Sequence, residues 1–242
     1  MTNYVLSAET RDKFKRIATP TIATALYKRG LRNQFIQDVH PLSTKPENMV
    51  GQAFTLRYIP AREDLNGLEV FRNPEHPQRV AVERAPAGSV LIIDSRKDAR
   101  AASAGSILIS RLQVRGVVGV VTDGGFRDTN GVFKTGLPAY HRRPSSPPSP
   151  IAHRPVDLQL PIGCGGVAVY PGDIVVGDRD AVLVIPSDIV DAVAEEAFKN
   201  YHYEGWAELE VAKGRSLKGL FPVAGDDAKR DYEAWKKAGG KL

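Results

Sequence analysis

The chain has 242 residues, which is room for one large domain or two small ones. With 42% hydrophobic and 25% charged residues, its composition excludes collagen-like, coiled-coil and fully disordered proteins. The net charge is +5, but 33 Lys and Arg residues are interleaved with 28 Asp and Glu residues, so nucleic acid is not an expected partner.

The first half of the chain alternates between helix and strand patterns. Ser7 and Thr19 are helix N-cap candidates, and Pro20 suits the first turn of the second helix, which we expect to end at Gly30. Further patterns predict a strand over 52–59, a helix around 80–83, buried parallel strands over 89–94 and 117–122, and between these two a helix that starts near Gly105.

Short strands separated by Gly- and Pro-rich turns dominate the second half and are typical of antiparallel sheet. Arg142–Pro150 is expected to be an extended proline-rich loop, and Pro186-Ser187 to cap a long helix that continues to Val211. We expect a further exposed helix after Asp226. The predicted strands are 137–140, 156–161, 167–170, 173–176 and 181–185.

These elements predict one α/β domain over residues 1–242. It has N-terminal helices over about 7–30, a parallel βαβ core, an added antiparallel layer and a C-terminal helical extension over about 187–242. Cys164 is the single cysteine, so a disulfide within the chain and a cysteine-based zinc cluster are excluded. Met1–Arg16 lacks the apolar block of a signal peptide, and no segment predicts a membrane span. A cytoplasmic location is the expectation.

The segment Asp123-Gly124-Gly125-Phe126-Arg127-Asp128 is the strongest candidate for a site. It follows the 117–122 strand at its C-terminal end, where ligands bind in α/β sheets. Two glycines allow close approach of a ligand, Arg127 offers a bidentate fork to an anion, and Asp128 is a potential ligand of a hard metal ion. An ordinary turn with a local ion pair is the alternative interpretation.

Three further candidates carry weaker signals. Gly105 opens a helix, and the free N–H groups of a first helical turn bind anions, although an ordinary glycine-led helix start has the same pattern. Cys164 is expected to be a packing residue rather than a nucleophile. His141 and His153 flank the proline-rich loop and are expected to be solvated, with a place in the lining of a pocket as the alternative.

The run Arg115–Asp128 resembles the RraA-like family, which joins the regulator of ribonuclease E activity A to metal-dependent 4-hydroxy-4-methyl-2-oxoglutarate aldolases. The likeness extends over about Thr19–Pro222 and includes the segments 51–55, 165–173 and 177–186. It implies a three-layer β/β/α swivelling domain that forms homotrimers or hexamers with active sites between subunits.

The resemblance to the aldolase branch implies roles for particular residues. Arg127 would bind the pyruvate half of a substrate, and Asp128 would hold Mg²⁺ or Mn²⁺. The backbone amides that would bind pyruvate belong to Gly105, Ser106, Ile107 and Leu108.

The sequence departs from the aldolase pattern at two positions. Ser106 and Gly131 stand where the family usually has acidic residues, which implies weaker metal binding or a different substrate. The aldolase branch also takes a glutamate from a neighbouring subunit, and Glu204 and Glu208 are both candidates.

The resulting expectation is a class II pyruvate aldolase, a carbon–carbon lyase. It would cleave a 4-hydroxy-2-oxo acid to pyruvate and a carbonyl compound, with oxaloacetate decarboxylation as a side activity and without a Schiff-base lysine. The alternative is a non-enzymatic regulator that binds a ribonuclease. The regulator branch often lacks the Asp after the Arg, so Asp128 favours the enzyme.

Overall fold

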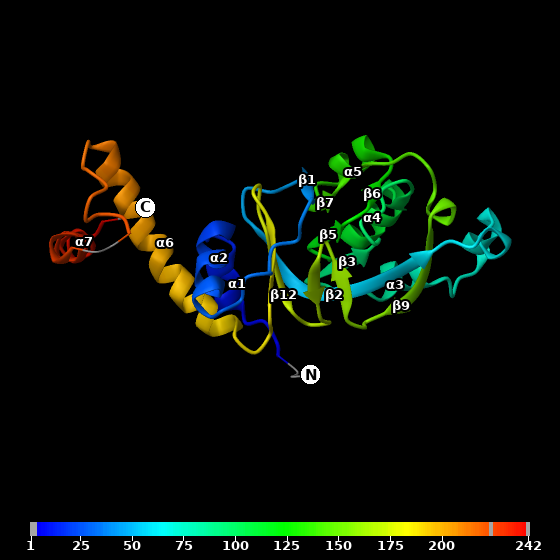
Figure 1. Ribbon diagram of the computed structural model, residues 1–242, viewed down its shortest axis with the longest axis horizontal. Helices are drawn as coiled ribbons and strands as arrows, with labels where there is room; N and C mark the ends of the chain where they lie inside the picture. Colours follow the sequence, from blue (N-terminus) through cyan, green and yellow to red (C-terminus); the bar gives the residue numbers. More distant parts are fainter. Residues whose placement is uncertain (1–3, 223–224, 241–242) are drawn as a thin grey trace.

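The computed structural model describes residues 4–222 and 225–240, and a mixed eight-stranded sheet runs through the molecule (Figure 1). The strand order across the sheet is β1-β7-β5-β3-β2-β12-β13, and β9 also pairs with β2. The pairs β7-β5, β5-β3 and β3-β2 are parallel. The other pairs, including β9 with β2, are antiparallel. The strands are β1 (His40–Ser43), β2 (Met49–Pro60), β3 (Ser89–Asp94), β5 (Gly119–Thr122), β7 (Ala139–His141), β9 (His153–Leu158), β12 (Ile174–Gly177) and β13 (Val182–Ile185).

Strand β3 separates two layers of the core. Its side chains alternate: Leu91 and Ile93 pack with the helices, while Val90 and Ile92 pack with Cys164 and its hairpin. Helices therefore cover one face of the sheet and a hairpin covers the other, which confirms the predicted three-layer fold. The covering elements are α3 (Pro77–Arg84), α4 (Ser106–Val114), α5 (Thr129–Thr135), β10 (Ile162–Cys164) and β11 (Val167–Val169).

A second sheet consists of three very short parallel strands, β4 (Ala102–Ala104), β6 (Gly125–Phe126) and β8 (Arg143–Pro144). The prediction of a loop over Arg142–Pro150 is therefore wrong at its start, and the turn η3 (Ser149–Ile151) forms at its end. Strands of two or three residues carry no alternation from which a sequence pattern predicts them.

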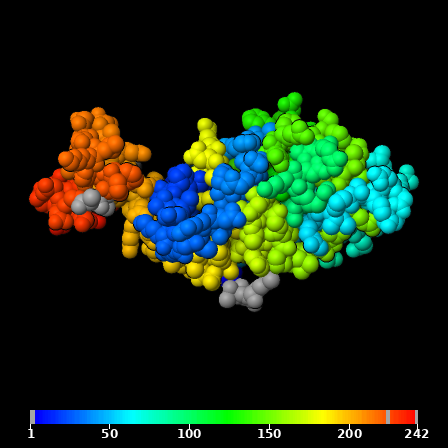
Figure 2. Space-filling view, viewed as in Figure 1, coloured from blue at the N-terminus to red at the C-terminus, as the bar shows by residue number. Residues whose placement is uncertain are grey.

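The terminal helices α1 (Ala8–Phe14), α2 (Thr19–Lys28) and α6 (Val190–Ala212) share a hydrophobic cluster with β12 and β13. From there α6 runs away from the sheet and carries α7 (Asp226–Lys237) at its far end (Figure 1). Figure 2 shows this C-terminal arm in orange and red, to one side of the main body. Trp206, Leu220 and Ala228 give the arm a small core. None of the described helices has the length and apolar character of a membrane span.

Three local predictions are wrong, for physical reasons. The strand expected at 137–140 corresponds to β7, which pairs parallel with β5 rather than in an antiparallel layer, because α5 returns the chain to the same edge of the sheet. The antiparallel neighbour of β7 is β1. Thr19 is not the cap of α2; its hydroxyl donates to Asp178 Oδ1 at 2.8 Å, and Ala18 is the capping residue. Ser187 lies in a turn, and α6 begins after Ile189.

Candidate functional site

The pairing of β4 with β6 brings the two predicted parts of the site together. Ala104 lies opposite Phe126, and the Arg127 amide donates to the Ala104 carbonyl at 3.1 Å. β4 leads into α4 through Gly105, and β6 leads into α5 through Arg127 and Asp128. The start of α4 and the Arg-Asp pair therefore lie side by side, as the family resemblance implies.

Gly105 is required by this close approach. A Cβ atom at this position would lie 2.7 Å from Asp128 Oδ2 and 3.0 Å from Arg127 Cγ, so a side chain here would displace the Asp128 carboxylate and the Arg127 side chain from these positions. Asp128 has φ of 56° at the start of α5, a left-handed conformation that Asp tolerates better than most residues. Its Oδ2 lies 3.4 Å from Arg127 Nε, and both side chains are about half exposed, 45% for Arg127 and 49% for Asp128.

These residues line a pocket of about 140 Å³. Gly105, Ile107, Leu108, Arg127 and Asp128 were predicted from the sequence; Ser106 is not a lining residue and lies against Gly131 instead. Sequence reasoning missed the opposite walls, because nothing in the pattern links residues so far apart in the chain. The missed lining residues are Phe71, Gln78, Arg79, Ala102, Ala104, Pro148 and Ser149.

A buried hydrogen-bond network supports β4 behind the pocket. The Gln78 amide donates to the Ser103 carbonyl at 2.7 Å, and the Tyr58 hydroxyl donates to the same oxygen at 2.9 Å. Both side chains are buried, so these hydrogen bonds form away from solvent. The network therefore fixes the strand that leads into Gly105.

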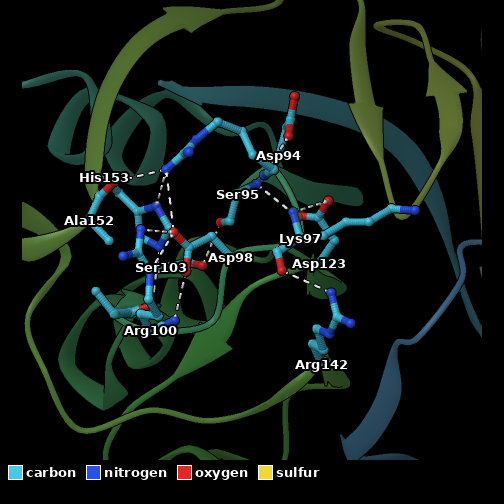
Figure 3. Close-up of polar contacts among 12 residues, drawn as sticks. Asp94, Ser95, Lys97, Asp98, Arg100, Ser103, Asp123, Arg142, Ala152 and His153 are labelled. Carbon is cyan, nitrogen blue, oxygen red and sulfur yellow. Dashed lines mark hydrogen bonds and ion pairs between the residues drawn. The ribbon is translucent and has the colours of Figure 1, made fainter. Parts of the chain in front are cut away.

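Asp123, the first residue of the candidate motif, has a structural role. Figure 3 shows it among polar residues of the loop after β3, and it does not line the pocket. Its carboxylate accepts the backbone amides of Ser95 (2.7 Å), Lys97 (3.0 Å) and Gly165 (3.1 Å). Burial raises its pKa above the usual range of Asp. This carboxylate therefore holds the end of β5, the loop after β3 and the turn between β10 and β11 together.

His141 and His153 are buried, so the prediction that they are solvated is wrong. The β7 and β9 strands carry them inward, and each ring stacks on an aromatic side chain. His141 Nδ1 accepts the Phe126 amide at 3.4 Å, one residue before Arg127. Burial, with a smaller contribution from His40, lowers the pKa of His141 to about 4. Cys164 is buried, as predicted, and burial raises its thiol pKa.

The buried His141 predicts acid sensitivity. Its pKa of about 4 lies below the ordinary value of 6.5, so the unfolded chain takes up a proton first, and stability is lost as the pH falls from 6.5 to 4. The loss due to this group should be up to about 3 kcal/mol.

The measurement is urea unfolding of the wild type and of His141→Gln at pH 7, 6, 5 and 4. Raised carboxyl pKa values, such as that of Asp123, act with the opposite sign in both proteins and cancel in the comparison. The stability advantage of the wild type should shrink with falling pH, and a pH-independent difference would contradict the assignment.

Among the lining residues that the structure describes, Asp128 is the one carboxylate. Among the described residues, no three His, Cys, Asp or Glu side chains cluster as metal ligands. A site with one carboxylate still fits Mg²⁺, which typically keeps several waters and binds through one or two carboxylates plus oxygens of a substrate. Glu204 and Glu208 belong to α6, which lies at the other end of the molecule from α4 and α5 (Figure 1), and they line a separate groove against α2.

The fold and the site define a class of α/β protein in which a helix start, an arginine and one carboxylate line a small pocket. A family model described as RraA-like, Aldolase/RraA, matches residues 19–184. The chain therefore belongs to the RraA-like family. It is 30% identical over 190 residues to a protein of Halalkalibacterium halodurans named "Putative 4-hydroxy-4-methyl-2-oxoglutarate aldolase", covering 77% of this chain and 81% of the relative.

Solved structures show the same fold. An uncharacterized protein from Pseudomonas syringae pv. tomato superposes with a TM-score of 0.75 at 20% identity and covers 89% of this chain and 98% of its own. Streptomyces coelicolor RraAS2, described as an unusual member of the RNase ES inhibitor RraA family, superposes with a TM-score of 0.74 at 24% identity. The match covers 84% of this chain and 97% of RraAS2. At these identities the likeness concerns the fold.

Proposed function

We propose that the protein is a divalent-metal-dependent pyruvate aldolase, a lyase that cleaves a 4-hydroxy-2-oxo acid to pyruvate and a carbonyl compound. The observation that carries this proposal is the convergence of Arg127, Asp128 and the start of α4 on one pocket. The name of the Halalkalibacterium halodurans relative supports the same reaction class. Decarboxylation of oxaloacetate is the expected side activity, because it leaves the same pyruvate enolate.

The residues of this chain divide the work of binding and charge stabilisation. The Arg127 guanidinium binds the carboxylate of the 2-oxo acid and lies beside the negative charge that develops when the carbon–carbon bond breaks. The free amides at the start of α4, from Gly105 to Leu108, bind the same end of the substrate. Together they orient the substrate for cleavage.

Asp128 is the residue that would hold Mg²⁺ or Mn²⁺. When bound, such an ion supplies Lewis-acid stabilisation of the developing enolate. Gly105 leaves the Asp128 carboxylate open to the pocket, since any side chain there would collide with its Oδ2 atom. Arg127 keeps this carboxylate oriented through its 3.4 Å ion pair.

The test is pyruvate release from oxaloacetate and from a panel of 4-hydroxy-2-oxo acids, read by a pyruvate-coupled assay. Release should require Mg²⁺ or Mn²⁺ and stop with a chelator. The alternative function, a regulator that binds a ribonuclease, is favoured by the fold shared with RraAS2. A protein that releases no pyruvate under any condition and inhibits a ribonuclease would establish that alternative.

We expect a homotrimer or a dimer of trimers. Ile107 on α4 and Phe133 on α5 are 81% and 65% exposed, so apolar side chains lie open on the two helices that carry the site. Glu204 or Glu208 of a neighbouring copy would complete the metal environment, since Asp128 lacks a second carboxylate in its own pocket. Light scattering at micromolar concentration should give three or six copies, and an active monomer would contradict the prediction.

A further inference from the structure

The pocket contains a second guanidinium group, contributed by Arg79. Helix α3 begins at Pro77 and places Gln78 and Arg79 in the wall of the pocket that Arg127 also lines. Asp128 is the only acidic residue among the lining residues, so the pocket walls carry two cations and one anion. Once Arg127 is assigned to the carboxylate of the 2-oxo acid, Arg79 is a second guanidinium for which the proposed function gives no role.

Arg79 has no carboxylate partner within the described residues, in contrast to other arginines near it. Arg111 pairs with Glu83 at 2.9 Å, and Arg100 pairs with Asp98 at 2.7 Å. The guanidinium of Arg79 instead lies over the face of Phe71, with its Cζ atom 5.2 Å from the ring centroid. A contact with the ring face leaves the N–H donors at the edge of the guanidinium available to a ligand.

The position of Arg79 is held by its neighbours. Phe71 belongs to the turn η2 (Leu68–Arg72), which follows the turn η1 (Glu63–Leu65), and its ring meets His76 edge-on at 5.5 Å. The Arg79 amide donates to the His76 carbonyl at 2.7 Å. These contacts fix the backbone of Arg79 and the Phe71 ring, and the guanidinium rests on that ring, which reduces the entropic cost of binding a ligand.

We propose that Arg79 determines substrate specificity by binding a second carboxylate, on the half of the substrate that leaves as the carbonyl compound. This inference rests on the proposed function, because it takes Arg127 and the start of α4 to bind the 2-oxo acid end. A guanidinium makes two parallel hydrogen bonds to a carboxylate. The oxoglutarate in the name of the Halalkalibacterium halodurans relative carries a carboxylate at each end. Arg79 binds the second carboxylate of such a substrate, so acids with an alkyl end are poor substrates.

The experiment compares two ligands of equal chain length that lack a C4 hydroxyl and so do not undergo retro-aldol cleavage. 2-Oxoglutarate carries a terminal carboxylate where 2-oxopentanoate carries a methyl group. Calorimetry with Mn²⁺ present should show that the wild type binds 2-oxoglutarate about 10- to 100-fold more tightly, as expected for a hydrogen-bonded charged group.

Arg79→Met is the decisive variant, because methionine keeps the helix propensity and the packing on Phe71. It should abolish the preference for 2-oxoglutarate and leave the affinity for 2-oxopentanoate unchanged. Arg84→Met is the matched control, on the exposed side of the same helix and outside the pocket, and should retain the preference.

Each outcome separates this inference from the proposed function. Wild-type binding of both acids with equal affinity overturns the role of Arg79 and leaves the 2-oxo acid site in place. A preference that survives Arg79→Met, or an equal loss of affinity for both acids, also overturns it. If the wild type binds neither acid and no pyruvate, the pocket is not a 2-oxo acid site and both proposals are wrong.

Discussion

Arg127→Lys should lose most of the pyruvate-releasing activity although the positive charge is kept. A lysine ammonium is a point charge and cannot make the two parallel hydrogen bonds that a guanidinium makes to a carboxylate. If Arg127 lies beside the developing enolate, the loss should be about 2–4 kcal/mol of transition-state stabilisation, or about 30- to 1,000-fold in kcat/KM. Steady-state kinetics with oxaloacetate and the best 4-hydroxy-2-oxo acid measure it.

The fold should tolerate this change. The side chain of Arg127 is 45% exposed, and the contact that anchors the residue is its backbone amide on Ala104. Thermal unfolding of the variant should therefore match that of the wild type within a few degrees. Arg84→Lys, on the exposed face of α3, is the control and should keep full activity. Unchanged turnover of a folded Arg127→Lys variant would remove Arg127 from the proposed mechanism.

Asp128→Asn should abolish stimulation by Mg²⁺ and Mn²⁺. Asparagine has nearly the same shape as aspartate and accepts the left-handed backbone at φ of 56°, so the loss reports on charge and not on folding. Because even the outer partners of metal ligands are worth about 10- to 100-fold in affinity, removing the ligand itself should cost at least about 100-fold. Titration of Mn²⁺ into chelator-stripped protein by calorimetry measures this.

Ser106→Asp is the complementary variant. It adds a carboxylate beside the start of α4, where the family pattern has an acidic residue, and Ser106 lies close to Gly131 at the edge of the site. A second negative charge beside the start of α4 should tighten Mn²⁺ binding by about tenfold. If Asp128→Asn retains metal-stimulated pyruvate release, the ion binds elsewhere and the proposed role of Asp128 is wrong.

The sequence was sufficient to predict the layers of the fold. The apolar runs of β3 and β5 on either side of the α4 pattern predicted a parallel core, because strands buried on both faces have few polar residues. The Ser7 cap and the helix start at Gly105 were predicted correctly from neighbouring residues, whereas the cap at Thr19 was not, because its hydroxyl donates to the distant Asp178.

The site was predicted in part. Arg127 and Asp128 stood out because they follow a buried strand, and the family resemblance supplied their proximity to Gly105. Arg79 was missed because its chemistry depends on what α3 faces, which periodicity does not encode. Asp123 was grouped with the site by its position in the motif, yet its carboxylate binds three backbone amides from other segments. Tertiary contacts of this kind have no local signature.

Gly131 also limits how the sequence of this chain can change. A Cβ atom there would lie 2.7 Å from Ser106 Cβ and 3.0 Å from its Oγ atom, so α4 and α5 start too close together for any other residue. Ser and Asp both carry a Cβ atom, so an acidic residue at 106 does not relieve this contact, and restoring one at 131 requires the two helices to move apart whichever residue stands at 106. In an evolutionary lineage, an acidic side chain at 131 is therefore expected to return only together with backbone changes in α4 or α5.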